Sequence, residues 1–166
     1  MIDVSTLRIT LLKDDHDRKG FDCGDFSLNN YLQKLARQDV KRRISRIFVA
    51  TSLEQPKTIL GYYTLSSLSI ELHHLPSKLA DRLPKHPVPA ALIGRLAVHK
   101  SYQQKGIGKM LLVDAIKRTL YVSEEIAIYA IVVDAIDSNA QVFYEQFGFH
   151  ELTSVKKRLF LPLKSV

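Results

Sequence analysis

The chain has 166 residues, 46% of them hydrophobic and 25% charged, which is the size and composition of one globular domain spanning residues 1–166. No apolar run approaches the about 18 residues of a membrane span, and the N-terminus lacks the basic start of a signal peptide. The net charge is +7. The single Cys23 suits a reducing compartment, so we expect a cytoplasmic protein that is not associated with a membrane.

The first half of the chain predicts strands and one amphipathic helix. Alternating or continuous apolar positions predict strands over 7–12, 47–51 and 59–70, with a turn around 55–57 between the last two. Leu28, Leu32, Leu35 and Ala36 recur on one face of a helix over 27–40. Either Asp25 or Ser27 is suited to cap its N-terminus.

The second half alternates strands and helices. Residues 73–89 hold four of the six prolines, which predicts a loop or a broken helical excursion. The elements predicted after it are a strand over 90–98, a helix over 109–118, a strand over 126–133, a helix from Asn139 to Gly148 and a strand over 157–163. A capping box at Ser138–Gln141 would start the last helix, and Pro162 favours an edge position for the last strand. The layout predicts a mixed α/β fold, with helices flanking a mixed sheet.

Two glycines, Gly106 and Gly108, lie between a predicted strand and a predicted helix. The segment is not a Walker loop, and Leu111 replaces the third glycine of a dinucleotide fingerprint. Glycines without Cβ atoms let the first amides of a helix approach an anion, and Lys105 and Lys109 add positive charge there. A tight turn that packs the helix on its strand explains the glycines equally well, so the residues alone leave both interpretations open.

A basic cluster follows the first predicted helix. It contains a single acidic residue, Asp39, and six basic residues, which are Lys34, Arg37, Lys41, Arg42, Arg43 and Arg46. Such a cluster attracts phosphate-rich partners through a salt-sensitive and sequence-independent interaction. Taken alone, the cluster is also explained by a solvated helical face, which is the more frequent situation in a cytoplasmic protein.

The glycine segment resembles the acetyl-CoA loop of the GNAT superfamily of N-acetyltransferases, whose pattern is Q/R-x-x-G-x-G/A. Gln103, Gly106 and Gly108 match all three specified positions. The preceding GRLAVHK and the later NAQVFYEQFGF at 139–149 are similar to the flanking segments of that family. The resemblance implies the GNAT acyl-CoA N-acyltransferase fold, acetyl-CoA as co-substrate and no metal.

The resemblance also implies roles for individual residues. Tyr144 would be the general acid, because a phenol with a pKa of about 10 is protonated at neutral pH and can donate to the departing sulfur. The strand before the loop would bind the pantetheine arm, and the loop amides would take the phosphates. The implied cofactor-binding residues are Leu96, Ala97, Val98, Gln103, Gln104, Lys105, Gly106, Ile107, Gly108, Lys109 and Asn139.

The N-terminal half is similar to the toxin branch of the family. The segments that carry this similarity are FDCGDFSLNNYL at 21–32, RIFVA at 46–50 and GYYTL at 61–65. Those toxins acetylate the amino acid on charged tRNA and are encoded beside a ribbon-helix-helix antitoxin. The resemblance further implies a homodimer, with promoter DNA bound only through the antitoxin complex. The residues expected to hold tRNA are Lys41, Arg42, Arg43, Arg46 and Arg95.

The sequence offers no obvious general base. An α-amino group with a pKa of about 7.7–8.0 needs little help to lose its proton, whereas a lysine with a pKa of about 10.4 needs a base. Glu71, His73 and His74 are candidates, although a surface position is the simpler expectation for each. Two alternatives stay open: a housekeeping N-acetyltransferase of a small amine or peptide N-terminus, and a non-catalytic DNA-associated corepressor partner of an antitoxin.

Overall fold

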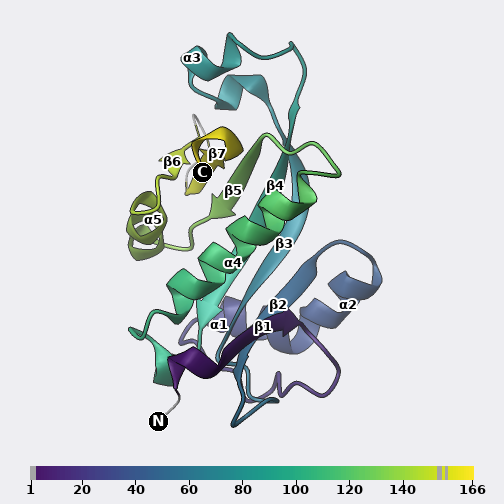
Figure 1. The fold of residues 1–166 in the computed structure, drawn as a ribbon, viewed down its shortest axis with the longest axis vertical. Coiled ribbons are helices and arrows are strands. Elements are labelled where there is room, and N and C mark those ends of the chain that lie inside the picture. Colours follow the sequence, from purple (N-terminus) through teal and green to yellow (C-terminus); the bar gives the residue numbers. More distant parts are fainter. Residues whose placement is uncertain (1–2, 153–154, 156) are drawn as a thin grey trace. The chain divides into compact units, whose positions relative to one another are not determined.

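The computed structural model describes residues 3–152, 155 and 157–166. Its strands form a mixed sheet in the order β1-β2-β3-β4-β5-β7-β6, with helices flanking it, which confirms the predicted fold class (Figure 1). The described residues fall into two compact units, one formed by residues up to 66 with 95–115, the other by 67–94 with 116–166.

Three long elements contribute residues to both units, and these are β3 (Gly61–Ile70), β4 (Val88–Val98) and α4 (Ile107–Val122). The remaining elements of the first unit are the 3-10 turn Val4–Thr6, β1 (Leu7–Leu11), α1 (Phe26–Asn30), the π-helical turn Tyr31–Leu35, α2 (Ala36–Lys41), β2 (Arg46–Ser52) and the 3-10 turn Lys100–Tyr102. β2 pairs antiparallel with both β1 and β3. The predicted strands are therefore confirmed, although β3 begins two residues later than expected.

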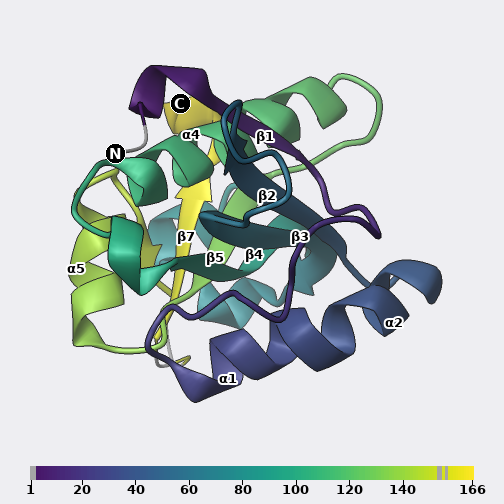
Figure 2. The same cartoon turned by 90° about the horizontal axis from the view of Figure 1, so that it is seen from below.

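The helix predicted over 27–40 is a run of α1, the π turn and α2 (Figure 2). Asp25 caps it, because its side chain accepts a hydrogen bond of 3.0 Å from the N–H of Leu28. The π turn was not predicted, and Leu35, which was expected on the apolar face, is 44% exposed. Leu28, Leu32 and Ala36 are all buried and lie four residues apart, whereas an α-helix makes a turn in 3.6 residues. The wider π turn keeps such residues on one line along the helix.

The core of the first unit forms between this helical run and the sheet. Its buried members are Phe21, Leu28, Tyr31, Leu32, Ala36, Ile47, Val49, Ile59, Tyr62 and Ala97. The Tyr62 hydroxyl donates a 2.7 Å hydrogen bond to the carbonyl of Leu28. This bond satisfies a buried polar group, and it also joins β3 to α1.

The second unit contains the C-terminal strands. Its remaining elements are the 3-10 turn Leu72–His74, α3 (Ser77–Ala80), β5 (Ala130–Asp134), α5 (Ser138–Glu145), β6 (His150–Glu151), β7 (Arg158–Pro162) and the 3-10 turn Leu163–Ser165. β4 and β5 run parallel, whereas β7 pairs antiparallel with both β5 and β6. The core residues of this unit are Ile70, Leu75, Val88, Ala90, Ala130, Val132, Leu152 and Phe160.

Three sequence predictions in this unit need correction. The strand predicted over 126–133 begins at Ala130, and Ile126 is 67% exposed, so apolar character there does not mark the sheet. The cap of α5 is Asp137 instead of Ser138, because the Asp137 carboxylate accepts a 2.8 Å hydrogen bond from the N–H of Ala140. The predicted excursion at 73–89 is confirmed as α3 with its flanking turns, but β4 already begins at Val88.

The last strand is also not at the edge of the sheet. β7 lies between β5 and β6, and Pro162 pairs with Ala130. The pairing of β6 reaches only from Leu159 to Phe160 on β7. Pro162 is therefore beyond the reach of β6, and the missing N–H of proline costs no ladder hydrogen bond on that side.

Gly61 at the start of β3 permits a close approach within the first unit. A Cβ atom at this position would lie 2.9 Å from the carbonyl oxygen of Ala97 and 2.9 Å from the Cδ1 of Leu111.

We predict that Gly61→Ala lowers the free energy of unfolding by about 1–3 kcal/mol, as overpacking of a core does. Denaturant unfolding measures the change. As a control, Ala substituted for the exposed Ser27 in α1 should leave the stability nearly unchanged, and an equally stable Gly61→Ala protein would contradict the packing argument.

Candidate active site

The glycine segment forms a turn between β4 and α4. Gln104 and Gly106 have positive φ angles of 63° and 85°, and α4 starts with a hydrogen bond from Met110 N–H to the Gly106 carbonyl. A Cβ atom at Gly106 would meet no heavy atom within 4 Å, so the backbone angle, and not crowding, favours glycine there. The space beside the Gly106 Cα is therefore open.

The amides of this turn suit an anion. In the described part of the chain, no acceptor is found for the N–H groups of residues 104–109. They belong to the first turn of a 16-residue helix and to the loop before it, where backbone donors have no intrahelical partner. Lys105 and Lys109 are exposed beside them. Donors, helix polarity and charge together fit the pyrophosphate of a coenzyme A thioester.

Gln103 braces the turn from behind. Its Nε2 donates to the carbonyl of Val98 at 2.9 Å and to the carbonyl of Cys23 at 3.1 Å. The sequence predicted Gln103 as one of the cofactor-binding residues. In the structure its side chain ties the turn to the end of β4 and to the N-terminal segment, and a contact with the coenzyme stays a prediction.

The end of β4 leaves the ladder with β5. The parallel register runs from Ala90–Ala130 to Ile93–Val133, and the described residues show no β5 partner for Leu96, Ala97 or Val98. Ala97 is buried, whereas Leu96 and Val98 are half-buried. Backbone groups that lack a strand partner on one side remain available to a bound chain such as a pantetheine arm.

Tyr144 lies in the second unit, on α5. Its side chain is 3% exposed and makes edge-to-face contacts with Phe143 and Phe149. Burial, and secondarily the Asp134 carboxylate, raise the pKa of the Tyr144 phenol. Its hydroxyl has no hydrogen-bond partner among the described residues, and no buried side-chain oxygen or nitrogen there is unsatisfied. The ring is therefore covered by aromatic neighbours, and the phenol is held in its protonated form.

Asn139 lies on the same helix as Tyr144 and is exposed. The structure thus brings the turn residues together in the first unit, and it places Asn139 and Tyr144 together on α5 in the second. Asp137, which the sequence analysis missed as a cap, fixes the start of this helix. Its signal was a short acidic residue directly before Ser138, and the competing capping-box pattern obscured it.

The predicted tRNA residues lie on the first unit. Lys41, Arg42, Arg43 and Arg46 are exposed, and the part of the chain that is described contains no ion pair to any of them. Arg43 has a φ of +60°, and hydrogen bonds from Arg43 N–H to Val40 and from Ile44 N–H to Asp39 close the turn. Arg95 on β4 stacks on the Tyr31 ring, with its guanidinium carbon 3.6 Å from the ring centroid. Sequence reasoning found the basic residues but not this aromatic support.

The remaining titratable candidates gain no support. Glu71 and His73 are exposed and His74 is half-buried, in and beside the 3-10 turn Leu72–His74 of the second unit. Burial raises the pKa of the half-buried Cys23 thiol, which disfavours a nucleophilic thiolate. Within the residues described, no cluster of three His, Cys, Asp or Glu side chains is placed to hold a metal ion. The helices described include none that is long and apolar enough to span a membrane.

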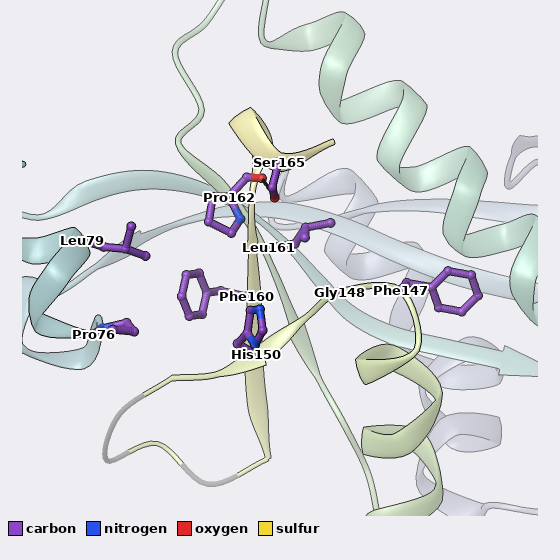
Figure 3. Close-up of a pocket in the computed structure, with 9 residues that line it drawn as sticks. All are labelled: Pro76, Leu79, Phe147, Gly148, His150, Phe160, Leu161, Pro162 and Ser165. Atoms are coloured by element: carbon purple, nitrogen blue, oxygen red, sulfur yellow. Dashed lines mark hydrogen bonds between the residues drawn. The ribbon is translucent and has the colours of Figure 1, made fainter.

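The second unit also has a hollow of about 600 Å³. Figure 3 shows Phe160, Leu161 and Pro162 of β7 on one side and Leu79 and Pro76 on another, with His150 beside Phe160. The remaining lining residues are Phe147, Gly148 and Ser165. Because this lining is mainly apolar and His150 is its only titratable side chain, we assign no acyl-transfer chemistry to the hollow.

A family profile described as "Acetyltransferase (GNAT) domain" matches residues 43–151, which include the glycine turn and Tyr144. The chain belongs to the GNAT acetyltransferase family. Two relatives extend over nearly the whole sequence. The "tRNA-acetylating toxin" of Mycobacterium tuberculosis is 33% identical, covering 92% of this chain and 90% of the relative. The "Probable toxin TacT" of Sinorhizobium fredii is 30% identical, covering 91% of this chain and 87% of the relative.

Solved structures of GNAT toxins share the fold. AtaT complexed with acetyl-methionyl-tRNAfMet matches with a TM-score of 0.88 at 30% identity, covering 96% of each chain. A variant of AtaT bound to the C-terminus of the antitoxin AtaR and to acetyl-CoA matches with a TM-score of 0.82 at 29% identity, covering 96% and 95%. A KacTA–DNA complex matches with a TM-score of 0.80 at 31% identity, covering 96% and 94%.

The state of the Tyr144 hydroxyl generates a prediction about catalysis. We expect Tyr144→Phe to keep the fold and the affinity for acetyl-CoA, because the ring and its aromatic contacts remain. Turnover should fall by about a hundred- to ten-thousandfold, the usual contribution of a positioned general acid. Steady-state kinetics together with calorimetric acetyl-CoA binding measure both quantities. Tyr121→Phe is the matched control, because it removes the hydroxyl of a 79% exposed tyrosine on α4. Turnover of Tyr144→Phe equal to the parent would remove Tyr144 from the mechanism.

Proposed function

We propose that this GNAT protein is an acetyl-CoA-dependent toxin that acetylates the α-amino group of aminoacyl-tRNA and thereby blocks translation. The observation that carries the proposal is the glycine turn, whose unpaired amides and flanking lysines fit a coenzyme pyrophosphate. Relatives over nearly the full length, named for toxin activity and tRNA acetylation, support the choice of substrate.

The coenzyme would be held by backbone more than by side chains. Residues 104–109 would donate their N–H groups to the phosphates, with Gln103 keeping the turn in place. The end of β4 that has no β5 partner among the described residues, at Leu96, Ala97 and Val98, would bind the pantetheine arm. Asn139 would contact the coenzyme from α5. A variant of AtaT bound to acetyl-CoA, which shares the fold, supports this co-substrate.

The reaction requires the protein to place the amine against the thioester and to supply one proton. The neutral α-amine attacks the thioester carbonyl, a C–N bond forms, and the C–S bond breaks. Tyr144 gives its phenolic proton to the departing sulfur, and the proton lost by the new amide nitrogen restores the phenol, so the atoms and charges balance. Because burial raises the pKa of Tyr144, the phenol stays protonated at neutral pH. An α-amine with a pKa of about 7.7–8.0 is already partly neutral at physiological pH, so no residue is assigned as a general base.

The exposed basic turn would bind the tRNA. Lys41, Arg42, Arg43 and Arg46 have no ion-pair partners in the described residues, and like charges repel a cationic small substrate such as a polyamine. This argues against one form of the housekeeping alternative. The buried Tyr144 phenol, whose hydroxyl makes no hydrogen bond to the residues described, argues against a purely non-catalytic corepressor.

The partners follow from the same assignment. We propose a cytoplasmic protein that acts as one catalytic domain over residues 1–166, because β3, β4 and α4 run through both compact units. Its proposed partner is a ribbon-helix-helix antitoxin, with promoter DNA bound only through the complex, and its proposed oligomeric state is a homodimer. The antitoxin and DNA complexes of AtaT and KacT relatives support the antitoxin.

Acetyl transfer from labelled acetyl-CoA tests the function. The acceptors are a charged total-tRNA pool, uncharged tRNA and a panel of small amines and peptide N-termini. We expect label on charged tRNA only, released together with the amino acid when the ester is hydrolysed. Label on small amines alone would establish the housekeeping enzyme, and no transfer to any acceptor would favour the corepressor.

A charge reversal tests the tRNA surface. We expect Arg42→Glu with Arg43→Glu to weaken the binding of charged tRNA and to reduce its salt dependence by about two phosphate contacts. The KM for acetyl-CoA should not change. Lys57→Glu with Lys117→Glu is the control, because it removes the same charge from exposed lysines elsewhere. Equal loss of binding in both double variants would reduce the effect to net charge alone.

A further inference from the structure

Arg95 has an unusual partner for an arginine near a basic cluster. Its guanidinium carbon lies 3.6 Å from the centroid of the Tyr31 ring. Among the described residues, no carboxylate forms an ion pair with it. Stacking occupies a face of the planar guanidinium and leaves the N–H donors at its edge available for an anion. The Arg95 backbone is fixed as well, since its N–H donates to the Thr64 hydroxyl at 3.1 Å.

The ring under Arg95 is held in place by a second interaction. Tyr31 is 2% exposed, opens the π turn, and donates its hydroxyl to the Asp39 carboxylate at 2.6 Å. Burial, and then Asp39, raise the pKa of the Tyr31 phenol to about 12. The phenol therefore remains a hydrogen-bond donor across the physiological pH range.

Asp39 connects this pair to the basic turn. Its carboxylate accepts from Tyr31, and its backbone carbonyl accepts a 2.9 Å hydrogen bond from the N–H of Ile44. Ile44 directly follows Arg42 and Arg43 in the turn. Arg95 and the basic turn are far apart in sequence, yet one aromatic ring and one carboxylate link them within the first unit.

The choice of partners is informative. Asp39 is the single acid among six basic residues between positions 34 and 46, and charge compensation alone would pair it with one of them. It binds a neutral phenol instead. Arg37 pairs with Asp14 at 2.9 Å, whereas Arg42, Arg43 and Arg46 have no ion pair among the described residues. This arrangement preserves positive charge on the surface while fixing where that charge lies.

We infer that Tyr31 and Asp39 are positioning residues that set Arg95 and the Lys41–Arg46 turn as one surface for consecutive phosphodiesters of the tRNA acceptor arm. The inference rests on the proposed aminoacyl-tRNA substrate and assigns two residues that contact no substrate themselves. Arg95 supplies an oriented guanidinium from β4, and the turn supplies the flanking charges. The relative positions of Arg95 and the Lys41–Arg46 turn, more than the number of charges, would then determine the affinity for the acceptor arm.

Binding of charged tRNA in the absence of acetyl-CoA tests the inference for the full chain. The variants are Tyr31→Phe, Asp39→Ala and Arg95→Met, each alone, and Tyr31→Phe combined with Arg95→Met. Tyr31→Phe keeps the ring but removes the bond to Asp39. We expect each single variant to bind roughly three- to tenfold more weakly, as the loss of one interaction implies. Arg95→Met should also lower the salt dependence by about one phosphate contact.

The double variant separates positioning from simple destabilisation. If Tyr31 acts through Arg95, the combined variant binds no more weakly than Arg95→Met alone. Tyr63→Phe is the matched control, because the Tyr63 hydroxyl also donates to an aspartate, Asp114, at 2.6 Å in the same unit. It should lower thermal stability comparably but leave tRNA affinity and the KM for acetyl-CoA unchanged.

The outcomes distinguish this inference from the proposed function. Additive losses in the double variant, or an equal loss of tRNA affinity in Tyr63→Phe, would overturn the positioning role even if charged tRNA is acetylated. Binding of charged tRNA without acetylation would refute the proposed function and leave the positioning result valid as measured. A parent protein that binds no tRNA at all would overturn both.

Discussion

The close contact at Gly61 constrains the rest of the first unit. Without a side chain there, the Ala97 carbonyl and the Leu111 side chain both approach to 2.9 Å of the position that a Cβ atom would take. This contact fixes the start of α4 against the end of β4, so the segment between them must join two fixed points. Gln104 and Gly106 adopt left-handed angles to do so, and their amides have no acceptor among the described residues. The candidate anion cradle is thus a consequence of packing beneath it.

The buried tyrosines divide by what their hydroxyls do. Tyr31 donates to Asp39, Tyr62 to the Leu28 carbonyl and Tyr63 to Asp114. A buried hydroxyl without a partner costs free energy, so these three bonds are what a stable core requires. Tyr144 is as deeply buried but has no such partner among the described residues. Tyr144 therefore differs from the three structural tyrosines in that no hydrogen bond to a described residue fixes its hydroxyl.

Local signals predicted most of the fold, and the errors arose where neighbours decide. Glycine turns, helical periodicity and strand alternation located nearly every element, and the Asp25 cap was among the two residues expected. The apolar character of Ile126 predicted a strand, but no neighbouring strand pairs with it. Pro162 favoured an edge position for the last strand. The sequence does not reveal that the neighbouring β6 is only two residues long and therefore does not reach Pro162. For the site, motifs named the turn and Tyr144, whereas the bracing by Gln103 and the stacking of Arg95 depend on tertiary contacts.

The distribution of charge explains why such contacts would be retained. Uncompensated positive charge on one surface destabilises the folded chain through self-repulsion. Asp39 could relieve part of this repulsion by pairing with an arginine, but it binds Tyr31 and keeps the turn closed through Ile44. A polyanion that binds only the folded state would offset the repulsion and stabilise the protein by mass action. A bound polyanion such as tRNA would therefore increase the stability of the folded chain, which agrees with a tRNA substrate.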